Sequence, residues 1–344
     1  MKKSFDEVFE DRTKYGTKVK TDEYKECGKH LIIDQGQEQI AGYTDLDEGL
    51  FEKVPVIIFG DHTRVIKYID EPFFLGADGV KVLRSKYENA NYKYLYYALK
   101  NANIPNTGYN RHFKWLKEVA IEYPDADIQK KIVEILDKVN VVIDVRQQEL
   151  QKLDELIKSR FVELFGNPKT NPMGLIETTI GDECFYIKDG PHKSLPDIGK
   201  ENGGHPFISV RNIVNGYIDF SSAKYISDED YADAIKKCHP EKGDMLYSKG
   251  GTTGIAKLID IDEEFANWVH VAVLKFDKTK LNGIFFENML NGDYCYKQSQ
   301  RLTKGIANRD LVLSAIAQIK IYRPPMELQE QFADFVTQID KYKF

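Results

Sequence analysis

The segment Ile121-Glu122-Tyr123-Pro124 leads into Ile128-Gln129-Lys130-Lys131-Ile132. It returns about two hundred residues later as Ile321-Tyr322-Arg323-Pro324, which leads into Leu328-Gln329-Glu330-Gln331-Phe332. Each copy has the pattern of a strand end, a proline stop and a helix start. The spacing is too long for a solenoid repeat, so it predicts a duplicated unit made of a domain and a helix. Such a chain would contact two similar targets at a fixed separation, one with each domain.

The repeat divides the chain into four predicted parts. We expect a first domain over 1–124, a long spacer helix over 125–166, a second domain over 167–323 and a shorter second helix over 324–344. In the first spacer, apolar residues recur every three or four positions, which is the stripe of a coiled coil. A lone helix of about 60 Å is not stable in water, so the stripe predicts a partner helix.

The two predicted domains share a turn. Tyr247 to Asp260 lies over Phe59 to Asp70 with a two-residue gap, and Asn308-Arg309 lies over Asn110-Arg111. A final strand is expected over Trp115–Tyr123 in the first domain. The front halves do not align, which suits two related α/β (α+β) domains with twisted sheets that recognise different targets.

Bulk composition favours a globular chain without a catalytic site of its own. An apolar content of 42% among 344 residues is enough for real hydrophobic cores, so the chain is not a disordered one. Neither a signal core nor a membrane-spanning apolar run is present, which predicts a cytoplasmic protein. The four cysteines form no CxxC pair. No P-loop, HExxH, GxSxG or Asn/Asp-Pro-Pro-Tyr/Phe motif occurs, so no catalytic, cofactor or metal residue is expected.

Polar loops at strand ends are the candidate contacts. Their Arg, Lys, Asn, Asp, His and Thr side chains could read base edges or bind phosphates, although each loop alone is equally well explained as a solvated turn. The net charge of −6 argues against a general nucleic-acid coat but permits local base-reading loops. The candidate DNA-binding residues are Asp61, His62, Thr63, Arg64, Tyr109, Asn110, Arg111, Lys188, His192, Lys193, Arg211, Asn212, Lys249, Thr252, Thr253, Lys304, Asn308 and Arg309.

Several motifs together resemble the specificity (S) subunit of type I restriction–modification systems. Phe59-Gly60-Asp61-His62-Thr63-Arg64 and Gly76-Ala77-Asp78-Gly79 resemble one type of target-recognition domain. Ile187-Lys188-Asp189-Gly190-Pro191-His192 and Pro206-Phe207-Ile208-Ser209-Val210-Arg211-Asn212-Ile213 resemble a second type. Phe161 to Pro172 resembles the family's linker, so the resemblance covers nearly the whole chain.

The resemblance implies a fold and a role. Two target-recognition domains, held apart by long helices that form an antiparallel coiled coil, would each read one half of a split DNA site in the major groove. Two modification (M) subunits carrying S-adenosylmethionine would methylate adenine, and restriction (R) subunits with Mg²⁺ and ATP would cut. The S subunit itself would catalyse nothing. We expect Arg64→Ala and Arg309→Ala each to cost about 1–3 kcal/mol at one base pair.

One departure and two competing interpretations remain open. The second helix reaches Phe344, where the family pattern continues for about another twenty residues, so association with a second copy through the helices is an alternative to a complete helix pair within one chain. A two-domain coiled-coil adaptor without DNA binding is the main competing function. An enzyme is the weakest, because the acid, metal and phosphate motifs are missing.

Overall fold

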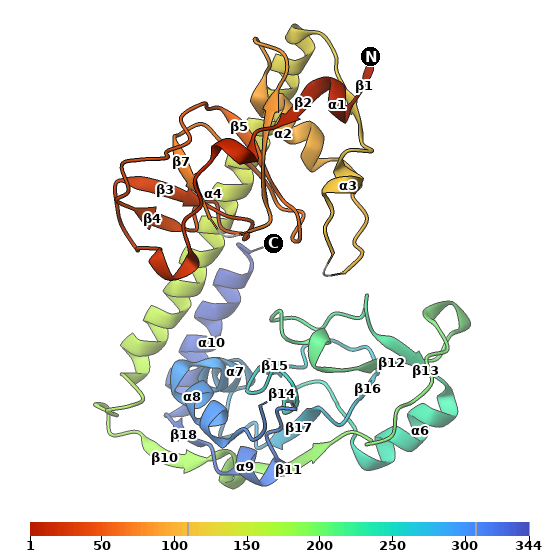
Figure 1. Cartoon of the computed structure of the whole chain (residues 1–344). Coiled ribbons are helices and arrows are strands. Elements are labelled where there is room, and N and C mark those ends of the chain that lie inside the picture. The colour runs from red at the N-terminus through yellow and green to blue at the C-terminus, as the bar shows by residue number, and fades with distance from the viewer. Residues whose placement is uncertain (77, 109, 307, 344) are drawn as a thin grey trace. The chain divides into compact units, whose positions relative to one another are not determined.

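The computed structural model describes residues 1–76, 78–108, 110–306 and 308–343. The chain forms two compact units, Met1–Arg146 and Gln147–Phe344. The dividing point falls inside the 40-residue helix α4 (Ala126–Phe165), so each unit carries part of that helix (Figure 1). This helix matches the predicted spacer. In the described residues, no helix is both long and apolar enough to cross a membrane.

Unit 1 contains two small sheets and a two-stranded ribbon. The ribbon pairs the first strand with the last, and the two sheets have the strand orders β2-β8-β5-β6 and β4-β3-β7. The elements are β1 (Lys2–Ser4), α1 (Phe5–Val8), β2 (Phe9–Asp11), η1 (Thr13–Tyr15), η2 (Thr21–Glu23), β3 (His30–Ile33), β4 (Gly42–Thr44), β5 (Val56–Gly60), β6 (Ile66–Ile69), β7 (Phe73–Leu75), β8 (Val80–Ser85), α2 (Tyr92–Lys100), α3 (Phe113–Leu116) and β9 (Ala120–Glu122).

Unit 2 repeats this plan. Its ribbon is β10-β18, and its sheets have the orders β11-β17-β14-β15 and β13-β12-β16. The elements are β10 (Ile176–Thr179), α5 (Ile180–Glu183), β11 (Cys184–Asp189), η3 (Lys200–Asn202), β12 (His205–Ile208), η4 (Val210–Asn212), β13 (Lys224–Ile226), α6 (Asp228–Lys237), β14 (Met245–Ser248), β15 (Ala256–Leu258), β16 (Ala266–Asn267), β17 (Val271–Phe276), α7 (Gly283–Asn291), α8 (Asp293–Leu302), α9 (Leu313–Ala317), β18 (Lys320–Arg323) and α10 (Met326–Asp340).

The duplication extends to the front halves that do not align in sequence. In unit 1, β3 pairs antiparallel with β4 and parallel with β7. In unit 2, β12 pairs antiparallel with β13 and parallel with β16. The topology is therefore shared throughout, because strand pairing depends on the alternation of apolar residues rather than on their identity.

A buried glutamine anchors each spacer helix to its own unit. Gln129 Nε2 donates to the carbonyl oxygen of Pro124 at 2.8 Å, and Gln329 Nε2 donates to that of Pro324, also at 2.8 Å. The two glutamines are 4% and 0% exposed. Because these four residues belong to the repeated segment, the repeat preserves the joint between domain and helix.

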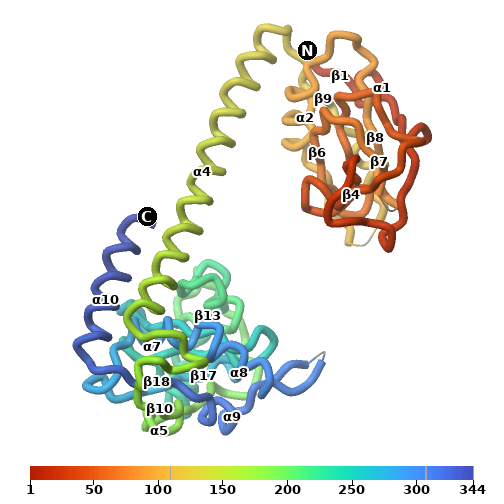
Figure 2. The backbone as a smooth tube through the Cα atoms, turned by 90° about the vertical axis from the view of Figure 1, so that its left-hand side faces the viewer, coloured from red at the N-terminus to blue at the C-terminus, as the bar shows by residue number. Residues whose placement is uncertain are grey.

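Helix α10 lies beside the C-terminal part of α4 within unit 2, and the two run antiparallel (Figure 2). Phe161 and Phe165 of α4 pack with Phe285 of α7 and Phe332 of α10, at ring-centroid distances of 4.9 to 5.8 Å. Lys343 reaches back to Asp154 at 2.9 Å. The expected antiparallel helix pair is therefore formed over this stretch.

The predicted final strand of unit 1 was too long. Residues 113–116 form the short helix α3, and only Ala120–Glu122 is extended. The Asp61 carboxylate accepts the backbone N–H of Phe113 at 2.7 Å, which satisfies a first-turn donor of this helix. Such a cap comes from a residue distant in sequence, so local patterning could not reveal it.

Candidate nucleic-acid interface

The turn after β5 and two other segments of unit 1, around Gln35 and around Asp78, are joined by hydrogen bonds. Gln35 accepts the His62 N–H through its side-chain oxygen at 3.1 Å and the Thr63 hydroxyl through its backbone oxygen at 2.6 Å. Its side-chain nitrogen donates to the carbonyl oxygen of Asp78 at 2.9 Å. The Asp61 N–H donates to Gly79 at 2.7 Å. One glutamine thus joins two of the motifs that carry the family resemblance.

Arg64 ties this turn to the loop over 101–112. Its guanidinium donates to the carbonyl oxygen of Ile104 at 3.0 Å. The backbone of Arg64 is left-handed, with φ of 62°. Buried His112 donates its N–H to the carbonyl oxygen of Asp61 at 2.7 Å. The same loop presents the exposed side chains of Asn110 and Arg111.

The equivalent turn of unit 2 has the same hydrogen bonds. In unit 1, the N–H of Gly60 donates to the carbonyl oxygen of Val65, and the N–H of Arg64 donates to that of Gly60. In unit 2, the N–H of Ser248 donates to the carbonyl oxygen of Ile255, and the N–H of Gly254 donates to that of Ser248. Gly254, with φ of 89°, takes the place of Arg64. This register contains the predicted two-residue gap.

The predicted alignment of Asn308-Arg309 with Asn110-Arg111 is shifted by one residue. The Asp61 carbonyl accepts the N–H of His112, whereas the Lys249 carbonyl accepts the N–H of Leu311. Arg111 therefore corresponds to Asp310. The loop lengths differ. The two Asn-Arg pairs therefore lie in corresponding loops but not at equivalent positions.

The loops of unit 2 surround a cleft of about 620 Å³. Three predicted residues, Arg211, Asn308 and Arg309, line it together. A neighbouring cavity of about 280 Å³ shares Arg211 and Trp268 with it. The remaining lining of the 620 Å³ cleft is Ser209, Val210, Gly250, Gly251, Trp268 and His270. Guanidinium and amide donors beside an aromatic wall suit the edges and faces of nucleobases.

Sequence reasoning missed Trp268 and His270. They join β16 to β17 and form an edge-to-face pair with ring centroids 4.8 Å apart. A Cβ atom on Gly250 would come within 2.0 Å of the His270 ring, so this glycine is needed for the close approach. The available signal was two aromatic residues, Trp268 and His270, close before the apolar run Val271-Ala272-Val273-Leu274.

Two buried charged residues, Lys249 and Asp189, lie among these loops. Lys249 Nζ is 3.1 Å from Asp310 and 3.5 Å from Asp189. Lys237 Nζ lies 2.9 Å from Asp189. Burial would raise the pKa of Asp189, but the hydrogen bond from Lys237 and the charges of Lys237, Lys249 and His192 outweigh it and lower that pKa below its ordinary value.

The predicted residues differ widely in accessibility. His62, Arg64 and Arg309 are half-buried, and Tyr109 lies outside the described residues. The buried ones are Asp61, Asn212, Lys249 and Thr253. The Asn212 side chain accepts the N–H of Ser209 and donates to the carbonyl oxygen of Asp219 and the hydroxyl of Ser222. The exposed ones are Thr63, Asn110, Arg111, Lys188, His192, Lys193, Arg211, Thr252, Lys304 and Asn308.

Comparison with known proteins identifies the family. The model of the type I restriction modification DNA specificity domain matches residues 1–155 and 183–344. The chain belongs to this family. The two matched segments fall one on each copy of the duplicated plan, so the family pattern and the observed topology divide the chain in the same way.

Individual relatives within the specificity-domain family are distant. The EcoR124I/EcoR124II specificity subunit of Escherichia coli is 28% identical over 236 residues, covering 64% of this chain and 56% of that protein. The MjaIX specificity subunit of Methanocaldococcus jannaschii is 25% identical, covering 64% and 54%. The match thus spans just over half the length of these relatives.

A solved structure supports the specificity-domain fold over the whole chain. The crystal structure of the type I restriction–modification S subunit from M. genitalium is similar with a TM-score of 0.59 at 18% identity. The similarity covers 100% of this chain and 90% of that one. It establishes the shared architecture of two domains and long helices.

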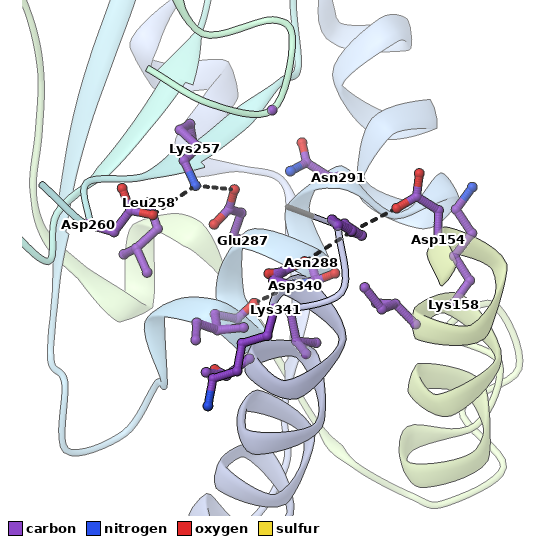
Figure 3. Close-up of a pocket in the computed structure, with 16 residues that line it drawn as sticks. Asp154, Lys158, Lys257, Leu258, Asp260, Glu287, Asn288, Asn291, Asp340 and Lys341 are labelled. Atoms are coloured by element: carbon purple, nitrogen blue, oxygen red, sulfur yellow. Dashed lines mark hydrogen bonds and ion pairs between the residues drawn. The ribbon is translucent and has the colours of Figure 1, made fainter. Parts of the chain in front are cut away.

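A second large cavity lies elsewhere in unit 2. It has about 610 Å³ and is lined by residues of α4, β15, α7 and α10 (Figure 3). Lys257 sits between Asp260 at 3.5 Å and Glu287 at 3.4 Å. Burial raises the pKa of Glu287, which the charge of Lys257 only partly opposes. Because these charges are paired with one another, this cavity offers less to DNA than the loop cleft.

Arg64 provides a test of the turn's geometry. We expect Arg64→Gly to be more stable than Arg64→Ala by about 1 kcal/mol, because both lose the bond to Ile104 but only glycine adopts φ of 62° without strain. Denaturant unfolding followed by Trp115 fluorescence in a Trp268→Phe background would report on unit 1. Equal stability of the two variants would contradict the left-handed assignment.

Proposed function

We propose that this chain is the DNA-recognition subunit of a type I restriction–modification assembly. Each unit would read one half of a bipartite site, and the helices would set the gap between the halves. The observation that carries the proposal is the hydrogen-bonded turn present in both units, with different exposed readers around it. A shared frame with divergent loops is what reading two different half-sites requires.

Exposure suggests a division of labour among the candidate residues. Arg111 and Asn110 in unit 1, and Arg211 and Asn308 in unit 2, are accessible enough to meet base edges. Asp61 and Asn212 would instead hold their loops in place, since their polar atoms are engaged inside the protein. The buried members of the predicted set thus act through the loops that they support.

The spacer helix offers a surface for partner subunits. On the part of α4 within unit 1, Ile135, Val139 and Val142 are 61%, 47% and 67% exposed. We assign this apolar stripe to an M subunit, in keeping with the family role of the helices, and we expect two M subunits per assembly. R subunits would join that complex. Catalysis, with S-adenosylmethionine, Mg²⁺ and ATP, would belong to these partners in the cytoplasm.

Substitution in the stripe should weaken the complex. Val142→Glu is expected to reduce M-subunit affinity at least about tenfold, because it places an unpaired charge in an apolar contact. Gln148→Glu, the same charge at an exposed polar position of α4, is the matched control. Titration calorimetry would measure both. Unchanged affinity of Val142→Glu would move the M-subunit contact off the stripe, and a stable dimer of the chain alone would place a second copy there.

DNA binding should depend on the M subunits. With a net charge of −6, the isolated chain is expected to bind DNA weakly, whereas the complex should bind tightly and lose affinity steeply as salt rises. A gel shift against mixed genomic DNA, with and without M subunits at two salt concentrations, tests this. A stable complex without any DNA binding would favour the adaptor function.

A further inference from the structure

Lys249 is buried and paired within the protein, unlike a residue that contacts DNA. Its side chain is only 7% exposed and its Nζ faces two carboxylates, those of Asp189 and Asp310. Its backbone N–H and carbonyl oxygen bond to His270 and Leu311 at 2.8 and 2.7 Å. A lysine held at both its backbone and its charge cannot extend to a phosphate without breaking this arrangement.

The two carboxylates come from different loops. Asp189 ends β11 and opens the loop over 189–194, which carries exposed His192 and Lys193. Asp310 lies in the loop over 303–311, where Lys304 and Asp310 exchange two backbone hydrogen bonds of 2.9 Å. That second loop presents Asn308 to the cleft. Lys249 is therefore a single charge shared by the two loops.

The far side of the first loop is fixed as well. Lys237 Nζ bonds to the Asp189 carboxylate at 2.9 Å and to the carbonyl oxygen of Gly190 at 2.6 Å. A Cβ atom on Gly190 would come within 1.7 Å of the carbonyl oxygen of Asn267, so this loop packs tightly on the strand end that precedes Trp268. The removal of Lys249 would leave Asp189 with Lys237, but it would take away the link to Asp310.

We propose that Lys249 is a positioning residue that couples the loops over 189–194 and 303–311, so that they read the second half-site as one body. The proposal rests on the proposed function for its DNA readout, and on the geometry alone for its mechanical part. Substitutions in two loops that share one charge network are expected to have non-additive effects on the discrimination between DNA sites. These effects become additive once the shared residue is removed.

The mechanical part is tested without DNA. Hydrogen exchange in the full chain is compared for wild type, Lys249→Met and Lys242→Met, the last breaking an exposed ion pair with Asp262 in the same unit. We expect Lys249→Met to speed exchange about tenfold in both loops, and Lys242→Met to leave both unchanged. Faster exchange in one loop only, or in neither, would overturn the coupling. If Lys249→Met does not fold, Asp310→Asn makes the same comparison.

The DNA part uses the complex with M subunits. Methylation rates on sites with single base-pair changes should show that Lys249→Met lowers discrimination across the second half-site about tenfold, with the first half-site and the salt dependence unchanged. In wild type, His192→Ala and Asn308→Ala should be non-additive, and additive in Lys249→Met. A uniform loss with a salt slope smaller by about 0.9 would make Lys249 a phosphate contact and overturn the proposal. A wild-type complex that methylates no bipartite site would refute the proposed function instead, while the exchange result would still decide the coupling.

Discussion

Phe332→Ala is expected to lower the free energy of unfolding of unit 2 by about 3–5 kcal/mol. Phe332 is fully buried on α10, and its ring meets those of Phe161 and Phe165 at 5.4 and 5.6 Å. Its truncation leaves a cavity between α10 and α4. Denaturant unfolding of the full chain, followed by Trp268 fluorescence in a Trp115→Phe background, would measure the loss.

Phe335 provides the matched control, since it lies on the same helix three residues later. It is only partly buried, and the ring centroid is 5.7 Å from the Arg160 guanidinium carbon. Phe335→Ala should therefore cost clearly less, about 1–2 kcal/mol. Equal losses for the two variants would mean that the aromatic cluster does not hold α10 against α4.

Arg111→Ala and Arg211→Ala are expected to relax opposite halves of the DNA site. Each should cost about 1–3 kcal/mol at one base pair, Arg111 in the half read by unit 1 and Arg211 in the half read by unit 2. Both side chains are exposed, Arg111 in the loop before α3 and Arg211 in η4, where its guanidinium also donates to the carbonyl oxygen of Ser222 at 2.7 Å. Methylation rates of the M-subunit complex on singly altered sites would assign each residue to its half.

The losses expected for Arg64→Ala and Arg309→Ala stay predictions, and we expect them to be smaller than those of Arg111→Ala and Arg211→Ala. Arg64 donates to the carbonyl oxygen of Ile104, and Arg309 is engaged with Gln300 and Thr253, so these half-buried side chains would have to give up contacts within the protein to meet a base. An equal loss on every sequence for Arg111→Ala or Arg211→Ala would indicate phosphate contacts. Loss in both halves from one substitution would contradict separate reading by the two units.

Sequence periodicity was a sound guide to the long elements. The proline stops at Pro124 and Pro324 correctly located the starts of α4 and α10. Those signals are local, since a few residues suffice to define a helix face or a strand. The repeat also carried the buried glutamines, whose role became visible only with their Pro124 and Pro324 partners.

The candidate interface was less predictable, because tertiary contacts decide which of its polar residues are buried and which are exposed. Asp61 and Arg111 are both polar loop residues, yet one is buried against Phe113 and the other is exposed. Trp268 and His270 enter the cleft only because β16 and β17 bring them beside Gly250. A polar letter in a loop does not reveal whether its partner is a backbone amide or a ligand.

The most direct test of the account is the methylome of cells that express this chain with its M subunits. The account predicts a split adenine-methylated motif, with two specified halves and a fixed gap, that disappears when the gene for this chain is deleted. A stable complex with an unchanged methylome would contradict the claim that the two units read DNA.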